Sequence, residues 1–325
     1  MTYGRKFIQA AAVLSATLLA SMGAAGQPYP SKAIHLVVAY PAGGASDALA
    51  RQIGPVLTDK LGQVVIVENR AGGATVIAAQ AVAGSAPDGY TIAIFDPTTV
   101  AMNPYLFKKL PYEPVKSFQP VSLLTRIPFG IMVLPGFPAN NLKEFVAHVK
   151  ANPGLNFASS GAGNPVHLAM EQFKDVAGLS INHVPYKGGA PAIQDLLGGH
   201  IPMIMMDIPS AMPHIKAGKI KVLALTSAKR LEQLPEVPTI SESGYPGFEA
   251  GSWFGAFVPM GTPPAIVARL NSTLREGVAG GALNSWIKSM TFEPYTSTPE
   301  EFSRRIASDA GIYGKLIKQL GLTLD

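Results

Sequence analysis

One short stretch shows the pattern of the whole chain: residues 34–47 read IHLVVAYPAGGASD. Its first half, Ile34–Tyr40, is a short apolar run rich in β-branched residues, which is typical of a buried strand. Pro41–Gly44 ends that strand, and Asp47 then opens a segment, Ala48–Leu61, whose apolar residues recur at helical spacing. Strand, glycine turn and helix in this order predict a βαβ unit.

The same order recurs along the chain. We predict further strands at Val64–Glu68, Tyr90–Phe95, Leu155–Ala158, Ile181–Val184, Met203–Met206 and Val222–Thr226. We predict helices at Val76–Ser85 and from about Val166 to Ala177. A further helix follows Pro185–Ala190 and ends at about Gly198, and two more lie at Pro264–Gly277 and Pro299–Leu320. Strands that alternate with helices favour an α/β fold with parallel strands.

Two long extended segments, Val121–Leu134 and Gly251–Pro259, have no helix beside them in the sequence. We interpret them as two crossings between lobes, because 325 residues exceed one ordinary hydrophobic core. The sequence therefore predicts one lobe from residues 28–124 plus 255–325 and a second lobe from residues 125–254.

The composition excludes several classes of protein. Only 14% of the residues are charged, where about 25% is usual, and 47% are hydrophobic, which excludes a disordered chain. The absence of cysteine excludes disulfide scaffolds and thiolate metal sites. With 26 Lys and Arg against 21 Asp and Glu and no basic cluster, we expect no nucleic-acid partner.

The N-terminus has the features of a secretory signal peptide. Arg5 and Lys6 precede an apolar run, Phe7–Ala20, which small residues follow up to Gly26. The run is too short for the roughly 20 residues of a spanning helix, although an uncleaved anchor is the alternative. We therefore expect residues 1–26 to be a signal peptide cleaved near Gly26, and the mature protein to be exported.

Two glycine turns stand where α/β sheets bind ligands, between a strand and the following helix. Pro41–Asp47 follows the first strand, and Ser159–Asn164 has the same placement further along, with His167 just inside the next helix. The first turn of a helix offers unpaired N–H groups to an anion. The alternative is that both are ordinary turns in which Asp, Ser or Asn caps a helix. A third turn contains Tyr186 and Lys187.

Enzyme motifs are missing from the sequence. We find no G-x-S-x-G nucleophile elbow, no H-E-x-x-H zinc motif and no complete dinucleotide or phosphate-loop fingerprint. An exported hydrolase stays open as an alternative, with Ser46 or Ser160 near His167 as its nucleophile and base. A ligand sensor for a signalling partner is another. Asp47, Asp96 and Asp207 stand near predicted strand ends, where they can converge.

A series of short motifs runs in order through the whole mature chain: Tyr29–Lys32, Pro41–Asp47, Val67–Gly72, Ala86–Thr91, Ser160–Gly163, His167-Leu168, Val184–Gly189, Gly251–Gly255 and Pro259–Pro263. Together these motifs resemble the Bug-type solute receptors of tripartite tricarboxylate transporters. The resemblance implies a two-lobed α/β fold of the periplasmic-binding-protein type (type II-like), with two crossing strands and a cleft between the lobes.

The resemblance also implies the function. A non-enzymatic receptor of this kind closes on a small organic acid (a dicarboxylate, tricarboxylate, acidic amino acid or aromatic acid) and delivers it to membrane permease subunits. Backbone and hydroxyl groups of the two turns hold the carboxylate, partly through water, and Asp47 braces its turn. We expect a monomer without cofactor or metal. The expected ligand-binding residues are Tyr40, Ala42, Gly43, Gly44, Ser46, Asp47, Thr75, Ser159, Ser160, Gly161, Gly163, Asn164, His167, Tyr186, Asp207, Trp253 and Phe254.

The chain departs from the family pattern at two places. Ala39 precedes the aromatic Tyr40, where relatives often have proline. Thr75 and Val76 stand where the family usually keeps glycine-rich backbone, so we expect one wall of the pocket to be rebuilt.

Overall fold

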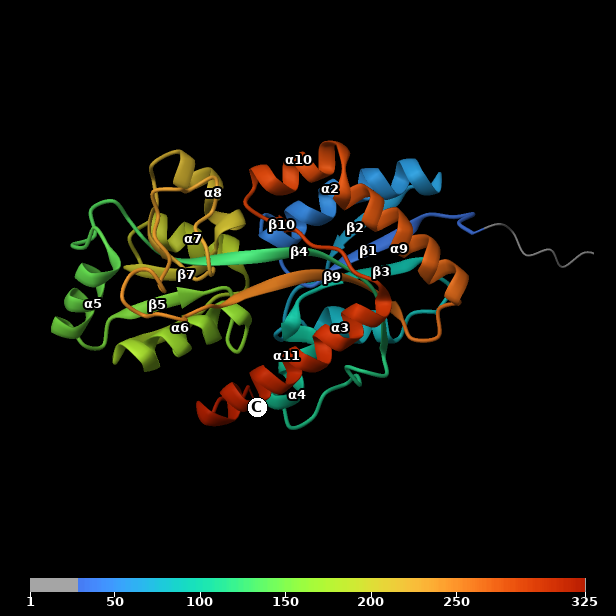
Figure 1. Cartoon of the computed structure of the whole chain (residues 1–325). Coiled ribbons are helices and arrows are strands. Elements are labelled where there is room, and N and C mark those ends of the chain that lie inside the picture. The colour runs from blue at the N-terminus through green and yellow to red at the C-terminus, as the bar shows by residue number, and fades with distance from the viewer. Residues whose placement is uncertain (1–28, 325) are drawn as a thin grey trace, which may run out of the picture. The chain divides into compact units, whose positions relative to one another are not determined.

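The computed structural model of the chain describes residues 29–324 (Figure 1). By its internal contacts the chain divides into residues 1–31 and residues 32–325. Of the first part, only residues 29–31 are described, and they form neither helix nor strand. The predicted signal peptide lies outside the described residues.

Residues 32–325 contain two α/β halves. The first half is built on the strand order β2-β1-β3-β9-β4, in which β1, β2 and β3 are parallel. Its strands are β1 (Ile34–Val38), β2 (Val65–Asn69), β3 (Thr91–Phe95), β9 (Gly251–Pro259), the first part of β4 (Phe118–Val133) and the short β10 (Glu293–Pro294).

The second half continues from the end of β4 in the order β4-β7-β5-β6, with β8 also paired to β4. Its strands are β5 (Asn156–Ser159), β6 (Asn182–Pro185), β7 (Met203–Asp207) and β8 (Lys221–Leu225). Strands β5, β6 and β7 are parallel, as the sequence predicts.

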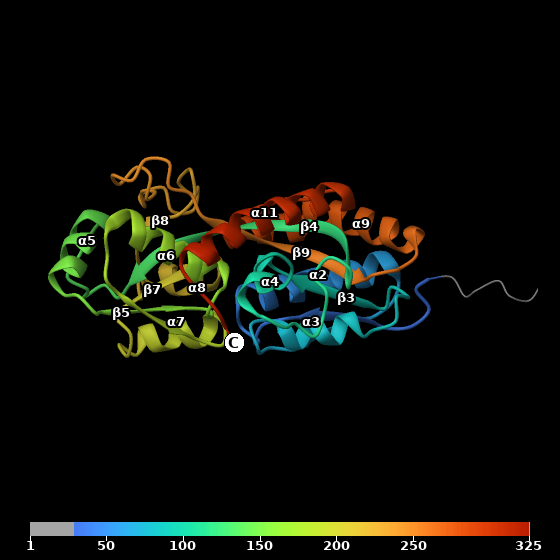
Figure 2. The same cartoon turned by 90° about the horizontal axis from the view of Figure 1, so that it is seen from below.

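The two crossing strands are antiparallel to their neighbours, so the sheet is mixed. β4 pairs with β9 over Phe118–Pro128 and with β7 over Phe129–Val133, and β9 pairs antiparallel with β3. Both strands run from one half into the other (Figures 1 and 2). The sequence patterns did not show this direction, because strand orientation depends on partners far along the chain. The predicted lobe boundaries near residues 124 and 254 stay a prediction.

Helices cover both faces of the first half of the sheet. Figure 1 shows α2, α9 and α10 together on one face and α3 and α11 on the other. The helical segments are α2 (Ala45–Leu61), α3 (Val76–Ala83), the π-helical turn η1 (Thr98–Met102), α4 (Asn103–Leu106), α5 (Leu142–Ala151), α6 (Pro165–Ala177), α7 (Gly189–Leu197), α8 (Ile208–Lys216), α9 (Pro264–Ala279), α10 (Gly281–Ser289) and α11 (Pro299–Gln319).

The start of α2 differs from the sequence prediction. The helix begins at Ala45 rather than Ala48, and its N-cap is Gly44, with no side-chain cap. The prediction that Asp47 caps the helix is therefore wrong. Asp47 instead lies inside the first turn, and its Oδ2 accepts a hydrogen bond from the Gly43 N–H at 3.0 Å.

Alternation along the strands explains the two core layers of the first half. Leu36 and Val38 on β1 pack toward α2, while Val37 packs with Phe95, Trp253 and other aromatic side chains under α11. Within the described part of the chain, no helix is long and apolar enough to cross a membrane.

Candidate functional site

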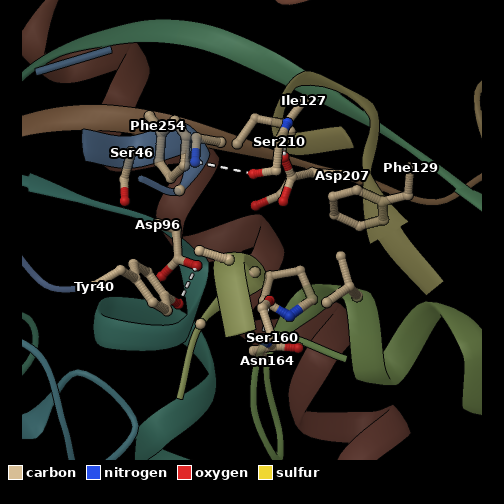
Figure 3. A pocket seen from close by; sticks show the side chains of 18 of the residues that line it. Tyr40, Ser46, Asp96, Ile127, Phe129, Ser160, Asn164, Asp207, Ser210 and Phe254 are labelled. Atoms are coloured by element: carbon tan, nitrogen blue, oxygen red, sulfur yellow. Dashed lines mark hydrogen bonds between the residues drawn. The ribbon is translucent and has the colours of Figure 1, made fainter. Parts of the chain in front are cut away.

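A small cavity lies where the carboxyl ends of β1, β3 and β7 approach the starts of four helices (Figure 3). Its volume is about 50 Å³. Since a buried water needs about 10–15 Å³ by this measure, this volume has room for a small solute or a few water molecules. Its lining residues are Tyr40, Pro41, Gly44, Ala45, Ser46, Asp96, Ile127, Phe129, Ser160, Asn164, Pro165, Val166, Gly188, Gly189, Ala190, Asp207, Ser210, Ser252 and Phe254.

The four helix starts at this cavity are of two kinds. α6 and α8 are capped from within the chain, because Asn164 accepts from the His167 N–H and Asp207 accepts from the Ser210 N–H. α2 and α7 have glycine N-caps, Gly44 and Gly188, and no side-chain cap hydrogen bond. The Ala45 N–H at the start of α2 donates to Ser210 of α8. The remaining backbone N–H groups at the starts of α2 and α7 have no capping side chain and are available for an anion.

The two halves touch beside the cavity. The Ala45 N–H at the start of α2 donates to the Ser210 Oγ of α8 at 3.0 Å. A Cβ added at Gly188 would lie 2.9 Å from Pro41 Cδ, so only glycine allows this approach. The two halves are therefore in direct contact at the border of the cavity.

Asp96 is a buried carboxylate on the wall of the cavity. Its side chain accepts hydrogen bonds from the Tyr40 hydroxyl at 2.8 Å, from the Thr98 N–H at 3.1 Å and from the Thr98 hydroxyl at 3.1 Å. Burial raises the pKa of Asp96 to about 6, and these hydrogen bonds oppose the rise. Burial and the nearby Asp96 charge raise the pKa of Tyr40 well above its usual range.

Asp207 is the second carboxylate on the wall. Its Oδ1 accepts from the Ser210 N–H at 2.8 Å, which places the carboxylate at the positive end of the α8 dipole. Burial raises the pKa of Asp207, and the hydrogen bonds from Ser210 oppose that rise. Figure 3 shows Asp96 and Asp207 on the wall of the same cavity. The sequence placed both residues near predicted strand ends, where side chains can converge.

Asp47 lies beside the cavity and holds the turn before α2. Its carboxylate accepts from the Gly43 N–H, from Asn69 Nδ2 at 3.0 Å and from Arg51 Nε at 3.0 Å. Desolvation of Asp47 is outweighed by these hydrogen bonds, of which that from Arg51 is the largest, so the pKa of Asp47 falls below its usual value.

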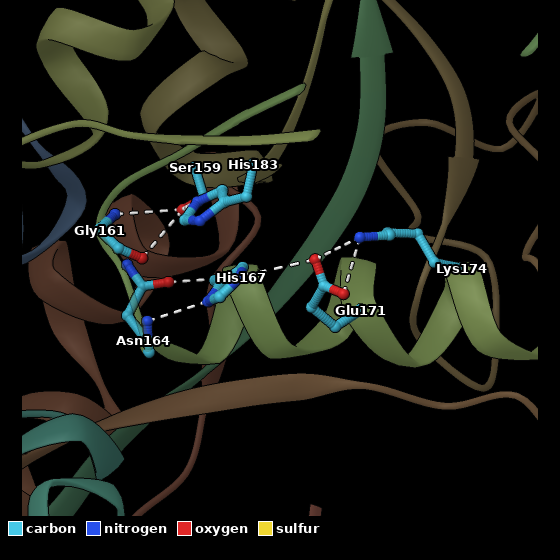
Figure 4. A network of polar contacts seen from close by, with 8 residues as sticks. Ser159, Gly161, Asn164, His167, Glu171, Lys174 and His183 are labelled. Carbon is cyan, nitrogen blue, oxygen red and sulfur yellow. Dashed lines mark hydrogen bonds and ion pairs between the residues drawn. The ribbon is translucent and has the colours of Figure 1, made fainter. Parts of the chain in front are cut away.

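The second predicted turn satisfies most of its polar groups internally (Figure 4). Asn164 Nδ2 donates to the Ser160 hydroxyl at 2.7 Å, and the Gly161 N–H donates to the Ser159 hydroxyl at 3.2 Å. The Gly163 N–H donates to His167 Nδ1 at 2.9 Å. This turn has fewer free donors than the sequence implied.

Two histidines stack behind this turn. The rings of His167 and His183 lie 3.7 Å apart, and His183 hydrogen-bonds with the buried Ser159 hydroxyl at 2.7 Å. Burial, together with the neighbouring His167, lowers the pKa of His183 to about 3. His167 engages Gly163 through Nδ1 and faces Glu171 through Nε2 at 3.5 Å. Both ring nitrogens of His167, the base in the alternative hydrolase hypothesis, are therefore engaged by neighbouring groups.

The structure places the predicted ligand-binding residues in four groups. Seven line the cavity: Tyr40, Gly44, Ser46, Ser160, Asn164, Asp207 and Phe254. Thr75, Gly161 and Tyr186 line a second cavity, which shares Tyr40 and Gly188 with the first, and Gly163 and His167 line a third. Ala42, Gly43, Asp47, Ser159 and Trp253 line none of these three cavities.

Two of these placements have clear physical reasons. Trp253 is fully buried, and its Nε1–H donates to Asp309 Oδ2 at 2.6 Å beneath α11. Thr75 has a φ of 74°, and its hydroxyl accepts from the Thr99 hydroxyl at 2.9 Å. The departure from the family pattern at Thr75 therefore lies at the second cavity.

Sequence reasoning missed several residues of the cavity wall. Gly189, Ala190 and Ser210 belong to helix starts whose nearness to α2 depends on tertiary packing. A usable signal was present in Tyr186–Gly189, a strand-to-helix turn with two glycines and no capping side chain. Among the described residues, no group of three or more His, Asp or Glu side chains is arranged to hold a metal ion.

A cavity between two α/β halves that two strands connect is the architecture of a periplasmic binding protein. A family profile described as "Tripartite tricarboxylate transporter family receptor" matches residues 49–322. The chain belongs to this receptor family.

Relatives and solved structures agree with this assignment. Protein BugT of Bordetella pertussis is 35% identical over 298 residues, which are 91% of each chain. The structure of Rpa4515 from R. palustris, solved with adipate, matches with a TM-score of 0.88 and 33% identity, covering 91% of this chain and 99% of that one. MatC (Rpa3494) from Rhodopseudomonas palustris, solved with malate, matches with a TM-score of 0.83 and 30% identity, covering 89% and 100%.

Proposed function

We propose that this chain captures a small carboxylate-bearing solute in the cavity between its two halves. The observation that carries the proposal is a pair of helix starts with glycine N-caps, at Gly44 of α2 and Gly188 of α7, on the wall of one cavity. Two relatives of the same fold were solved with adipate and with malate, which supports a carboxylate as the ligand.

Backbone amides and hydroxyls supply the anion site in this proposal. Each helix start favours an anion by about 0.3–2 kcal/mol, and each hydrogen bond to a charged group adds about 1.5–3 kcal/mol. Four or five such donors reach the roughly 8 kcal/mol of micromolar binding after ordering costs. Ser46 and Ser160 offer hydroxyls on the same wall. In this proposal the second set of backbone donors comes from the start of α7 rather than from the predicted turn, Ser159–Asn164.

The proposal extends to what happens before and after capture. We expect the chain to be exported with residues 1–26 as its signal peptide, to act as a periplasmic monomer, and to deliver its solute to membrane permease subunits of a tripartite transporter. The lobes of residues 28–124 plus 255–325 and of residues 125–254 open and close around β4 and β9. Binding occurs without turnover, since both ring nitrogens of His167 are engaged.

Calorimetry and thermal shift on the purified protein, against carboxylic acids and their esters or amides, test the proposal. The free acid should bind at least about tenfold more tightly than its masked form. Equal binding of a masked acid would refute the anion site, and conversion of the ligand during incubation would refute binding without turnover.

A matched pair of variants tests the helix start at α2. A Cβ at Gly44 meets no atom nearer than 3.9 Å, and one at Gly136 meets nothing within 4 Å. Both Gly44→Val and Gly136→Val should therefore fold, but only Gly44→Val places bulk on the cavity wall. We expect Gly44→Val to abolish acid binding and Gly136→Val to leave it unchanged. Wild-type affinity in Gly44→Val would exclude that helix start.

A further inference from the structure

The charge balance of the cavity is unusual for an anion site. Asp96 and Asp207 both line it, and among the described residues that line it there is no Lys, Arg or His. A solute that carries only carboxylates would therefore add negative charge beside two carboxylates, with helix starts and neutral groups as the sole compensation.

Local hydrogen bonding favours the ionised form of both side chains. Asp96 accepts three hydrogen bonds, from the Tyr40 hydroxyl and from the N–H and hydroxyl of Thr98. Asp207 accepts from the Ser210 N–H at the positive end of α8. Hydrogen bonds to a carboxylate stabilise its charged state, although burial opposes them here.

Helix capping alone does not require an acid at position 207. Asn164 caps α6 at the same cavity with a neutral amide oxygen, and asparagine caps a helix as well as aspartate does. A neutral residue at position 207 would therefore suffice for the start of α8. The two negative charges instead match a positive charge on the bound solute.

We propose that the solute carries a protonated amine as well as a carboxylate, and that Asp96 and Asp207 bind the amine. This inference rests on the proposed function. The carboxylate lies at the starts of α2 and α7, and the ammonium lies in the same cavity against the side chains of Asp96 and Asp207, which line it together with Tyr40. An ammonium group donates three hydrogen bonds, which these oxygens can accept.

Calorimetry at pH 7.5 with matched pairs of acids tests the proposal. The pairs are glutamate and glutarate, aspartate and succinate, and 4-aminobutyrate and butyrate, which differ by one amine. In at least one pair the amino member should bind at least about tenfold more tightly than the amine-free acid. Asp96→Asn and Asp207→Asn should each reduce that preference at least about tenfold.

Control variants separate charge at the cavity from charge elsewhere. Glu113 is exposed and pairs with Lys116, so Glu113→Gln removes one negative charge far from the wall and should leave the preference unchanged. Thermal melting of each variant without ligand shows that it is folded before binding is measured.

The outcomes distinguish the two proposals. If the amine-free acid binds equally or more tightly in every pair, and its ester does not bind, the amine site is refuted while the carboxylate receptor stands. If esters bind as well as acids, both proposals fail. If no member of any pair binds, the amine site is refuted, and the wider set of carboxylic acids tests the carboxylate receptor.

Discussion

Replacement of Asp96 by asparagine should stabilise the ligand-free protein. Burial raises the pKa of Asp96 from its ordinary value of 3.8 to about 6, and a shift of this size corresponds to about 3 kcal/mol. The folded state holds the Asp96 proton more tightly than the unfolded state does. The loss of folding free energy caused by the buried Asp96 charge is therefore absent below pH 4 and complete above pH 6. Asp96→Asn should therefore raise the free energy of unfolding by about 2–3 kcal/mol at pH 8 and change it little at pH 4.

Urea unfolding of both proteins at pH 8 and at pH 4, followed by circular dichroism, measures this difference. Comparison of the two proteins at each pH cancels the effect of all other carboxylates. Glu113→Gln serves as the control, since Glu113 is exposed, and should change stability by less than about 0.5 kcal/mol at either pH. A destabilised Asp96→Asn protein at pH 8, or the same difference at both pH values, would refute the reasoning.

Three further predictions concern packing around the site. A Cβ at Gly163, which has a φ of 69°, would lie 2.5 Å from Leu106 Cδ1, so Gly163→Ala should lower the free energy of unfolding by about 1–3 kcal/mol. Thermal melting measures the loss, and an unchanged Tm would contradict the clash. Trp253→Phe removes the hydrogen bond to Asp309 and should lower the free energy of unfolding in urea by about 1–3 kcal/mol. An unchanged free energy would show that this bond contributes nothing. Asn164→Ala should cost about 1 kcal/mol and Asn164→Asp little; equal losses in melting would exclude capping of α6.

The sequence predicted most of the regular elements of the fold. Strand β9 has the predicted bounds, Gly251–Pro259, and α6 differs from its predicted bounds by about one residue. The same patterns missed α5, α8 and α10, and they gave no direction for β4. Proline inside α8, at Pro213, weakens the helical pattern there.

The candidate site was predictable only in part. Glycine turns after strands pointed to Gly44, Ser46 and Ser160, which do line the cavity. The sequence could not show that Asn164 caps its own helix while α7 remains uncapped, because capping depends on the local backbone geometry of each turn.

The sequence by itself determined the α/β class, the glycine turns at helix starts and the low charge of the chain. These properties follow from periodicity and composition, which act over a few residues. Only the tertiary structure decided that Asp96 and Asp207, from different halves, share one cavity without a basic residue among its described lining. That convergence depends on strands paired across long separations in the chain, and it sets the charge that a bound solute meets.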